Sequence, residues 1–214
     1  MPGMPATSAS SDASRAIPVV RLAELPALAE KLAACARAGE FAPDVIVYVE
    51  TGARLLAHAL GERMAVPVVP VWVQRGGHGL KQKLAPLAAR LPVALRDALR
   101  RAEEISGVHR LTRRKTAMRA KESLVGKRVL LVDDASDTGR TLAAARGLVL
   151  ASGVAAADVR SAVLAATTPR GQAVVDFFLF DRNCRMPWSA DSDERVAAEA
   201  RAAQLAPADA PRPV

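Results

Sequence analysis

The chain has 214 residues, half of them hydrophobic, and a formal net charge of +8, so it is long enough to bury one substantial core. No apolar run approaches the roughly 18 residues of a membrane-spanning helix and residues 1–15 lack the apolar stretch of a secretory signal, so we expect a cytoplasmic protein. The only two cysteines, Cys35 and Cys184, are too isolated for a disulfide framework or a metal cluster, and the positive charge favours a polyanionic partner, either nucleic acid or a phosphorylated small molecule.

Helix and strand patterns alternate through the first part of the chain. Leucines at helical spacing predict a helix that ends at Gly39, and a β-branched run predicts the strand that follows it. A second helix, expected to end near Gly61, leads to a second strand. Residues 1–16 form a leader with little to bury, which we expect to be disordered. After it, the patterns predict in chain order a helix, a strand, a helix and a strand, at residues 26–39, 45–49, 53–64 and 66–75.

The second part of the chain adds an insertion, three strands and a tail. Leucines recur every three or four residues within 76–106, where Pro86 and Pro92 divide the pattern, so we expect a helical insertion there. Three roles stay open for this insertion: structural packing, a hood over an acceptor site, and a dimer surface. After the insertion, the patterns predict a strand at 128–134, a helix at 141–153, and two strands at 159–168 and 174–180. The tail at 195–214 is expected to begin as a short helix and to be largely flexible.

This alternation predicts the α/β class, with a mostly parallel open sheet covered by helices on both faces. The aromatic content of 3% fits such a protein better than an aromatic-rich β-sandwich. We expect one domain over residues 17–194, between the leader and the tail.

The stretch VLLVDDASDTGRTL, residues 129–142, carries the strongest chemical pattern in the chain. Four apolar residues lead into Asp133 and Asp134 at the carboxyl end of a predicted strand, where open parallel sheets bind ligands. Neighbouring carboxylates repel unless cations or hydroxyl donors compensate them, and a ribose diol with Mg²⁺ supplies both. Behind them, hydroxyls, Gly139 and a helix N-terminus converge on one spot, which predicts a phosphate site. For the turn by itself, the alternative is that its polar side chains only cap the helix that follows.

These residues resemble the phosphoribosyl diphosphate (PRPP) signature of the type I phosphoribosyltransferases. The resemblance implies that Asp133 and Asp134 bind the ribose hydroxyls and, through substrate and water, a Mg²⁺ ion, while the turn holds the 5-phosphate. Asp133, Asp134 and Asp137 are the candidate catalytic residues, for charge stabilisation or proton transfer. The substrate-binding residues implied by this motif are Asp133, Asp134, Ala135, Ser136, Asp137, Thr138, Gly139, Arg140 and Thr141.

A further resemblance lies after the first predicted strand, in VETGAR at residues 49–54. The family uses a loop at this place to bind pyrophosphate, which implies backbone N–H donors here. Purine-salvage members often carry Arg-Gly-Gly in this loop, and a plain strand-to-helix turn is the alternative for the sequence found. The implied donors are Thr51, Gly52, Ala53 and Arg54.

The segment CRMPWS, residues 184–189, resembles the closing Pro-Trp segment of bacterial xanthine-guanine phosphoribosyltransferases, which implies a base pocket containing Asn183 and Trp188. Asn183 stands where those relatives place a stacking aromatic ring. Those relatives also carry a lysine that binds the purine 6-oxo group, and residues 165–169 of this chain lack it. A non-purine acceptor, such as a pyrimidine or a specialised metabolite, therefore stays open, and a core position is the alternative for Trp188.

The basic stretch HRLTRRK, residues 109–115, precedes the signature strand, where family members carry a mobile loop. The resemblance implies a lid whose cations shield the charge on departing pyrophosphate. A solvated basic surface is the alternative. The four cations are Arg110, Arg113, Arg114 and Lys115.

Together these features predict a transferase that moves ribose 5-phosphate from PRPP to a nitrogen of a base and releases pyrophosphate, with Mg²⁺ as its cofactor and a homodimer as its assembly. The alternative is a non-catalytic regulator of the same fold that senses nucleotide and binds nucleic acid. Residues 75–121 have the positive charge for the second role but lack the interleaved aromatics of a single-strand stacking platform.

Overall fold

The computed structural model describes residues 17–50, 52–73, 116–118 and 123–206. Strands and helices alternate along these residues. The strands are β1 (Val45–Glu50), β2 (Val68–Val73), β3 (Thr116–Met118), β4 (Val129–Ser136), β5 (Val159–Ala166) and β6 (Phe177–Phe180). The helices are α1 (Leu25–Ala38), α2 (Arg54–Met64), α5 (Arg140–Ala151), α6 (Pro169–Gln172) and α7 (Arg195–Gln204), with 3₁₀ turns η1 (Leu22–Glu24) and η3 (Ala156–Asp158).

Within the described residues, the strands form one six-stranded sheet in the order β3-β2-β1-β4-β5-β6. Five of them run parallel, and β3 pairs antiparallel with β2. The predicted α/β class with a mostly parallel open sheet is therefore confirmed. Because β4 lies between β1 and β5, the segments that follow these three strands meet at one edge of the sheet.

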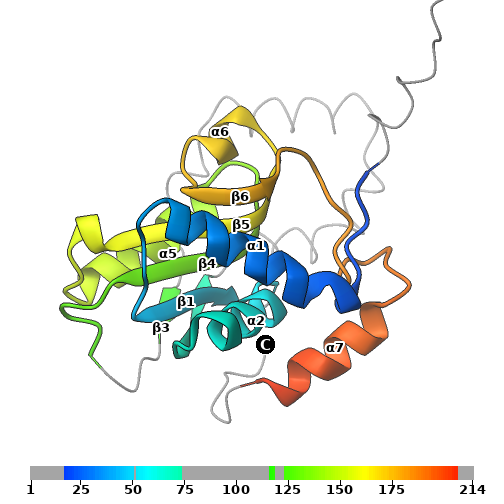
Figure 1. Cartoon of the computed structure of the whole chain (residues 1–214), viewed down its shortest axis with the longest axis horizontal. Coiled ribbons are helices and arrows are strands. Elements are labelled where there is room, and N and C mark those ends of the chain that lie inside the picture. Colours follow the sequence, from blue (N-terminus) through cyan, green and yellow to red (C-terminus); the bar gives the residue numbers. More distant parts are fainter. Residues whose placement is uncertain (1–16, 51, 74–115, 119–122, 207–214) are drawn as a thin grey trace, which may run out of the picture.

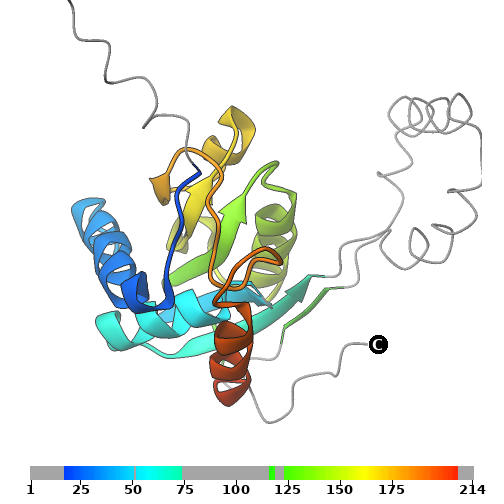
Figure 2. The ribbon, with the colours of Figure 1, turned by 90° about the vertical axis from the view of Figure 1, so that its right-hand side faces the viewer.

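Helices cover both faces of the sheet, with α1 and α2 on one side and α5 on the other (Figures 1 and 2). Alternate residues of each central strand point to opposite faces. Ile46 and Val132 pack in the cluster that includes α1 and α2, whereas Val47 and Leu131 pack in the cluster that includes α5. Burial on both faces explains why β1 and β4 are continuous apolar runs in the sequence.

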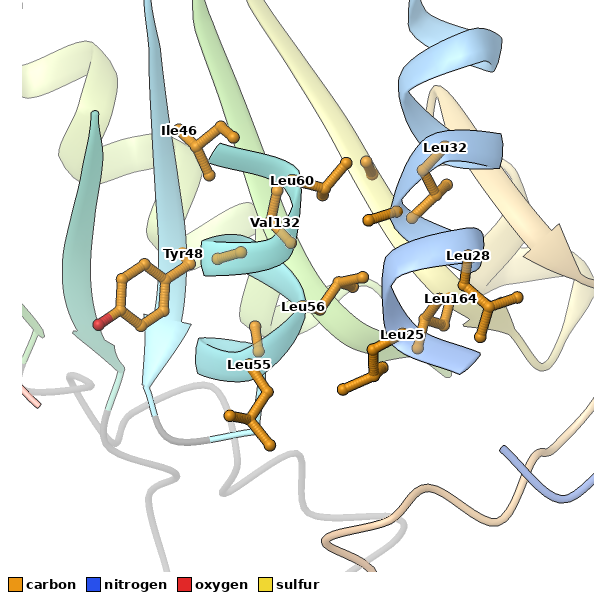
Figure 3. Close-up of a cluster of buried hydrophobic side chains, with 14 of the residues drawn as sticks. Leu25, Leu28, Leu32, Ile46, Tyr48, Leu55, Leu56, Leu60, Val132 and Leu164 are labelled. Atoms are coloured by element: carbon orange, nitrogen blue, oxygen red, sulfur yellow. The ribbon is translucent and has the colours of Figure 1, made fainter. Parts of the chain in front are cut away.

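The larger of the two clusters fills the space between the sheet and helices α1 and α2 (Figure 3). Leu25, Leu28 and Leu32 recur every three or four residues along α1, so all three face the sheet. Leu56 and Leu60 of α2 are fully buried beside them. Each such leucine contributes roughly 1.5–3 kcal/mol of transfer free energy. This burial fixes the start of α2 close to the end of β1.

Helix α2 continues past its predicted end near Gly61 to Met64. Gly61 packs against β2, because a Cβ there would lie only 2.8 Å from Val68 Cγ1. The helix ends at Met64, and its C-cap Ala65 has a left-handed φ of 55°. Gly61 therefore serves close helix-strand packing, and the helix ends slightly beyond the predicted place.

Two short elements and one strand end differ from the sequence patterns. Strand β4 continues through both acids to Ser136, two residues beyond its predicted end at 134. The patterns do not predict β3 or the single turn of α6, because elements this short show no period. The predicted leader at 1–16 and the helical insertion at 76–106 lie outside the described residues.

Residues 195–204, the first part of the expected tail, form α7, which packs against α2 and buries Ala198 completely. The chain before α7 is tied to the N-terminal segment by a parallel bridge between Val19 and Arg185. An ion pair of 2.6 Å joins Arg21 to Asp193. No helix of the described residues is long and apolar enough to cross a membrane.

Candidate active site

The two neighbouring acids lie in the C-terminal half of β4, and each accepts a hydrogen bond from the backbone amide of the next residue. Asp133 is 3% exposed and Asp134 is half-buried. The Asp134 N–H donates to Asp133 Oδ1 at 2.9 Å, and the Ala135 N–H donates to Asp134 Oδ1 at 2.8 Å. One oxygen of each carboxylate is thereby held in place.

A glycine turn joins β4 to α5. Gly139 is the N-cap of α5 and has a φ of 70°, a left-handed conformation that favours glycine. A Cβ at this position would also overlap the side chain of Val174. Asp137, Thr138 and Arg140 around the turn are exposed. The first N–H groups of α5 have no carbonyl partner within the helix, so this end presents donors and a positive dipole to the adjoining space.

The end of β5 supports this turn from one side. The Thr167 N–H donates to the Ser136 carbonyl at 2.9 Å, and the Thr167 hydroxyl donates to Asp137 Oδ1 at 3.1 Å. Thr168 caps α6 and donates its hydroxyl to the Asp137 carbonyl. Gly171 lies so close that a Cβ there would overlap the Ser136 carbonyl oxygen. The turn is therefore held by β5 and α6 as well as by its own residues.

The sequence patterns do not assign a role to these supporting residues. Residues 165–169 differ from the purine-salvage relatives by the lysine they lack, although Thr168 followed by Pro169 is a typical helix start. That pattern predicts the cap of α6. It does not reveal that the same hydroxyl contacts the turn after β4.

The carboxylate of Asp134 contacts two other parts of the chain. Trp188 Nε1 donates a hydrogen bond to Asp134 Oδ2 at 2.9 Å. Gly52 follows the neighbouring strand β1 and lies very close to the same carboxylate. A Cβ at Gly52 would overlap Oδ2 of Asp134 and lie 2.9 Å from its Cγ. The sequence predicts Trp188 in the base pocket, and the structure joins its indole to an acid of the PRPP motif.

A buried ion pair joins the last residue of β1, Glu50, to the first residue of α2, Arg54. Arg54 donates from Nε and Nη2 to the two carboxylate oxygens of Glu50 at 3.0 and 2.8 Å, and from Nη1 to the Ala202 carbonyl of α7 at 2.8 Å. The Ala53 N–H donates to the Val49 carbonyl at 3.3 Å. The Arg54 side chain therefore connects β1, α2 and α7, and Thr51 lies outside the described residues.

Burial and this ion pair perturb two neighbouring rings. Tyr48 donates its hydroxyl to Glu50 at 3.0 Å, and desolvation together with the Glu50 charge raises the pKa of Tyr48 above its usual value. His58 packs edge-on against Tyr48 with ring centroids 5.9 Å apart. Desolvation, followed by the charge of Arg54, lowers the pKa of His58. The cluster therefore favours a protonated tyrosine and a neutral histidine.

The pocket at the carboxyl end of β4 has a volume of about 450 Å³. Every residue that the sequence assigns to the PRPP motif lines it, whereas Gly52, Ala53, Arg54, Asn183 and Trp188 do not line it directly. Asn183 is exposed. The expected lid cations at 109–115 lie outside the described residues. The lining residues are Asp133, Asp134, Ala135, Ser136, Asp137, Thr138, Gly139, Arg140, Thr141 and Leu142.

The donor set of this pocket suits a magnesium ion that arrives with its substrate. No group of three or more His, Cys, Asp or Glu side chains in the described part of the chain could hold a metal alone. Asp133 and Asp134 supply two carboxylates to one pocket. Mg²⁺ commonly binds through one or two carboxylates, waters and substrate phosphates. These residues fit the ion in that mode.

The family model described as a phosphoribosyl transferase domain matches residues 21–192. No protein of known, curated function matches the sequence.

Solved structures with the same fold cover most of the chain. A purine phosphoribosyltransferase from Pyrococcus horikoshii is 22% identical with a TM-score of 0.55, over 80% of this chain and 93% of that one. A xanthine-guanine-hypoxanthine phosphoribosyltransferase from Helicobacter pylori is 16% identical with a TM-score of 0.54, over 81% and 94%. A hypoxanthine-guanine phosphoribosyltransferase from Bacillus anthracis is 17% identical with a TM-score of 0.51, over 77% and 84%.

Proposed function

The chain belongs to the phosphoribosyl transferase domain family and is a phosphoribosyltransferase, and from this premise we propose that it transfers ribose 5-phosphate from PRPP to a ring nitrogen of a purine base. One observation carries the proposal. Two acids and the N-terminal turn of α5 line a single pocket. A diol with a metal ion and a phosphate are the groups that such neighbours bind.

The 5-phosphate is assigned to the N-terminal turn of α5. Backbone N–H groups at a helix N-terminus bind anions, and the hydroxyls of Thr138 and Thr141 add donors from the pocket wall. Gly139 permits the close approach, because its φ of 70° turns the chain without a side chain in the way. This turn would fix one end of the substrate.

The ribose is assigned to Asp133 and Asp134. Both acids line the pocket, and an ionised carboxylate offers about four acceptor sites, so it can accept from sugar hydroxyls as well as from protein donors. Mg²⁺, when bound with PRPP, would neutralise diphosphate charge and make pyrophosphate a better leaving group. The two acids would hold that ion through the sugar and through water.

The reaction breaks the bond between the anomeric carbon and the diphosphate oxygen, and it forms a bond from that carbon to the base nitrogen. The anomeric carbon becomes positively charged in the transition state, as in glycoside cleavage. Asp134 and Asp137 are the groups proposed to stabilise that charge or to accept the proton from the base. No nucleophilic side chain is required, so positioning and electrostatics supply most of the catalysis.

A purine acceptor is proposed because the Pro-Trp segment resembles that of the xanthine-guanine enzymes and the similar folds bear purine phosphoribosyltransferase names. The exposed Asn183 and the missing lysine at 165–169 keep a non-purine base as the rival. The acceptor must therefore be identified by assay.

Pyrophosphate release with Mg²⁺, PRPP and a panel of purine and pyrimidine bases tests the proposal. We expect Asp133→Asn and Asp134→Asn to lower kcat/KM at least about 100-fold, the scale of a lost catalytic charge. Asp158→Asn is the matched control, because Asp158 in η3 precedes β5 and so lies at the sheet edge opposite the site. It should stay within about twofold.

Unchanged turnover in both site variants would reject the assignment of the acids. Binding of PRPP by the wild type without pyrophosphate release from any base would instead favour the nucleotide-sensing regulator.

A further inference from the structure

We propose that Trp188 is a positioning residue, which holds the Asp134 carboxylate in the orientation that PRPP requires instead of stacking on the base. This inference rests on the proposed function, because it gives Asp134 a substrate contact. The contact that carries it joins segments 54 residues apart, Trp188 Nε1 to Asp134 Oδ2 at 2.9 Å.

Three parts of the chain restrict the Asp134 carboxylate. Oδ1 accepts from the Ala135 N–H at 2.8 Å, and Oδ2 accepts from the indole of Trp188. Gly52 approaches from the end of β1 so closely that a methyl group at that position would overlap Oδ2. With both oxygens bonded and one side blocked by backbone, the group has little room to turn.

The indole donor is itself fixed by a structured segment. The Met186 N–H donates to Ser189 Oγ and the Ser189 N–H donates to the Met186 carbonyl, both at 3.0 Å, so a closed turn presents Trp188. Just before it, the Arg185 N–H donates to the Pro18 carbonyl at 2.8 Å. The Trp188 ring also packs against the core cluster between the sheet and α1 and α2.

This geometry leaves the carboxylate usable. An ionised carboxylate offers about four acceptor sites, and the two bonds from Ala135 and Trp188 occupy two of them. Indole is a donor only, so it can orient the acid without supplying or removing a proton in the reaction. Asp134 also lines the pocket, so its remaining acceptor sites can serve the substrate. Trp188 thus contributes alignment, and Asp134 makes the contact with substrate.

The first test compares the kinetics of Trp188→Phe with those of the wild type. Phenylalanine retains an apolar ring and removes the Nε1 donor. We expect kcat/KM for PRPP to fall about tenfold, which corresponds to about 1.4 kcal/mol, while KM for the base changes less than about twofold. Trp72→Phe is the matched control, since Trp72 lies on β2 and does not line the pocket.

The second test keeps Trp188 intact, so it does not depend on the stability of a Trp188 variant. The chain has two tryptophans, and Trp72→Phe leaves Trp188 as the only indole fluorophore. We expect Asp134→Ala in this background to shift the emission maximum without ligand, and Mg²⁺ with PRPP to change the emission when Asp134 is present. Asp158→Ala in the same background should leave the spectrum unchanged.

The outcomes separate this inference from the proposed function. If calorimetry detects no binding of PRPP with Mg²⁺ to the wild type, the proposed function fails and the inference fails with it. If the wild type binds PRPP while Trp188→Phe keeps wild-type kinetics, or loses only affinity for the base, the inference alone is overturned. An emission spectrum insensitive to Asp134→Ala would likewise overturn it.

Discussion

The buried ion pair between Arg54 and Glu50 allows a sharp test of how the loop after β1 is supported. The Glu50 side chain is 0% exposed and that of Arg54 is 12% exposed. Replacement of Arg54 by Met would remove both guanidinium hydrogen bonds from the Glu50 carboxylate and retain the one from the Tyr48 hydroxyl, at 3.0 Å. It would also remove the donor to the Ala202 carbonyl of α7. Removing one partner of a buried pair typically costs about 3–5 kcal/mol, because the other charge stays buried.

The expected change in melting temperature follows from this loss of unfolding free energy. A domain of about 150–250 residues loses about 2–4 °C per kcal/mol, so Arg54→Met should melt roughly 6–20 °C below the wild type. Adding Glu50→Gln to that variant removes the unpaired charge and leaves an amide that can still accept from Tyr48. The double variant should therefore be more stable than Arg54→Met alone, by urea and thermal unfolding.

Arg195→Met is the matched control for this prediction. Arg195 and Glu199 are also an Arg-Glu pair four residues apart, but their side chains are 48% and 57% exposed. The loss of an exposed pair should cost less than about 1 kcal/mol. An Arg54→Met protein as stable as the Arg195→Met protein would refute the buried-pair argument. A raised KM for PRPP with no loss of stability would instead indicate that the Arg54 side chain contacts the substrate.

Three further substitutions test the site and its surroundings. Gly52→Ala places a methyl group against the Asp134 carboxylate, so kcat/KM for PRPP should fall by about tenfold or more while the melting temperature changes little; equal kinetics would show that the carboxylate can move aside. Gly139→Ala introduces a side chain where φ is 70° and where a Cβ would overlap Val174, so it should lower the free energy of unfolding in urea by about 1–3 kcal/mol. Adding Val174→Ala should recover only the part of this loss that is due to the overlap. Burial lowers the pKa of His58 in the folded state, so its contribution to stability is complete above the unfolded pKa of about 6.5 and falls with pH below that value, as the unfolded chain takes up a proton. His58→Phe should therefore flatten the fall in unfolding free energy between about pH 6.5 and 5, and an unchanged slope would contradict this.

The sequence predicts that the residues after β4 lie together, because they are continuous in the chain. Residues 133–142 are a strand end, a glycine turn and the first turn of a helix, and all of them line one pocket. Each step depends on short-range chemistry: an apolar run before Asp133, a left-handed turn at Gly139, and exposed helix donors after it. The strand and helix pattern on either side is equally local, and it predicts the sheet's class.

The contacts that hold this stretch in place are long-range, and short patterns do not contain them. Trp188 lies 54 residues from Asp134, and Ala202 lies 148 residues from the Arg54 that donates to it. The sequence therefore gives Arg54 a role in the pyrophosphate loop and Trp188 a role in the base pocket. Neither residue type nor spacing reveals that these side chains are already bonded within the fold.

The order of strands in the sheet explains why these distant residues meet. β4 lies between β1 and β5 and all three are parallel, so the segments after them must share one edge. Gly52 follows β1 and abuts Asp134, while Thr167 follows β5 and donates to Asp137. The loop after β1 thus restrains Asp134, and the end of β5 restrains Asp137 in the turn that follows β4. Were β4 an edge strand, one of these restraints would be missing, so the central place of β4 allows Asp134 and Asp137 to be held from opposite sides before any substrate arrives.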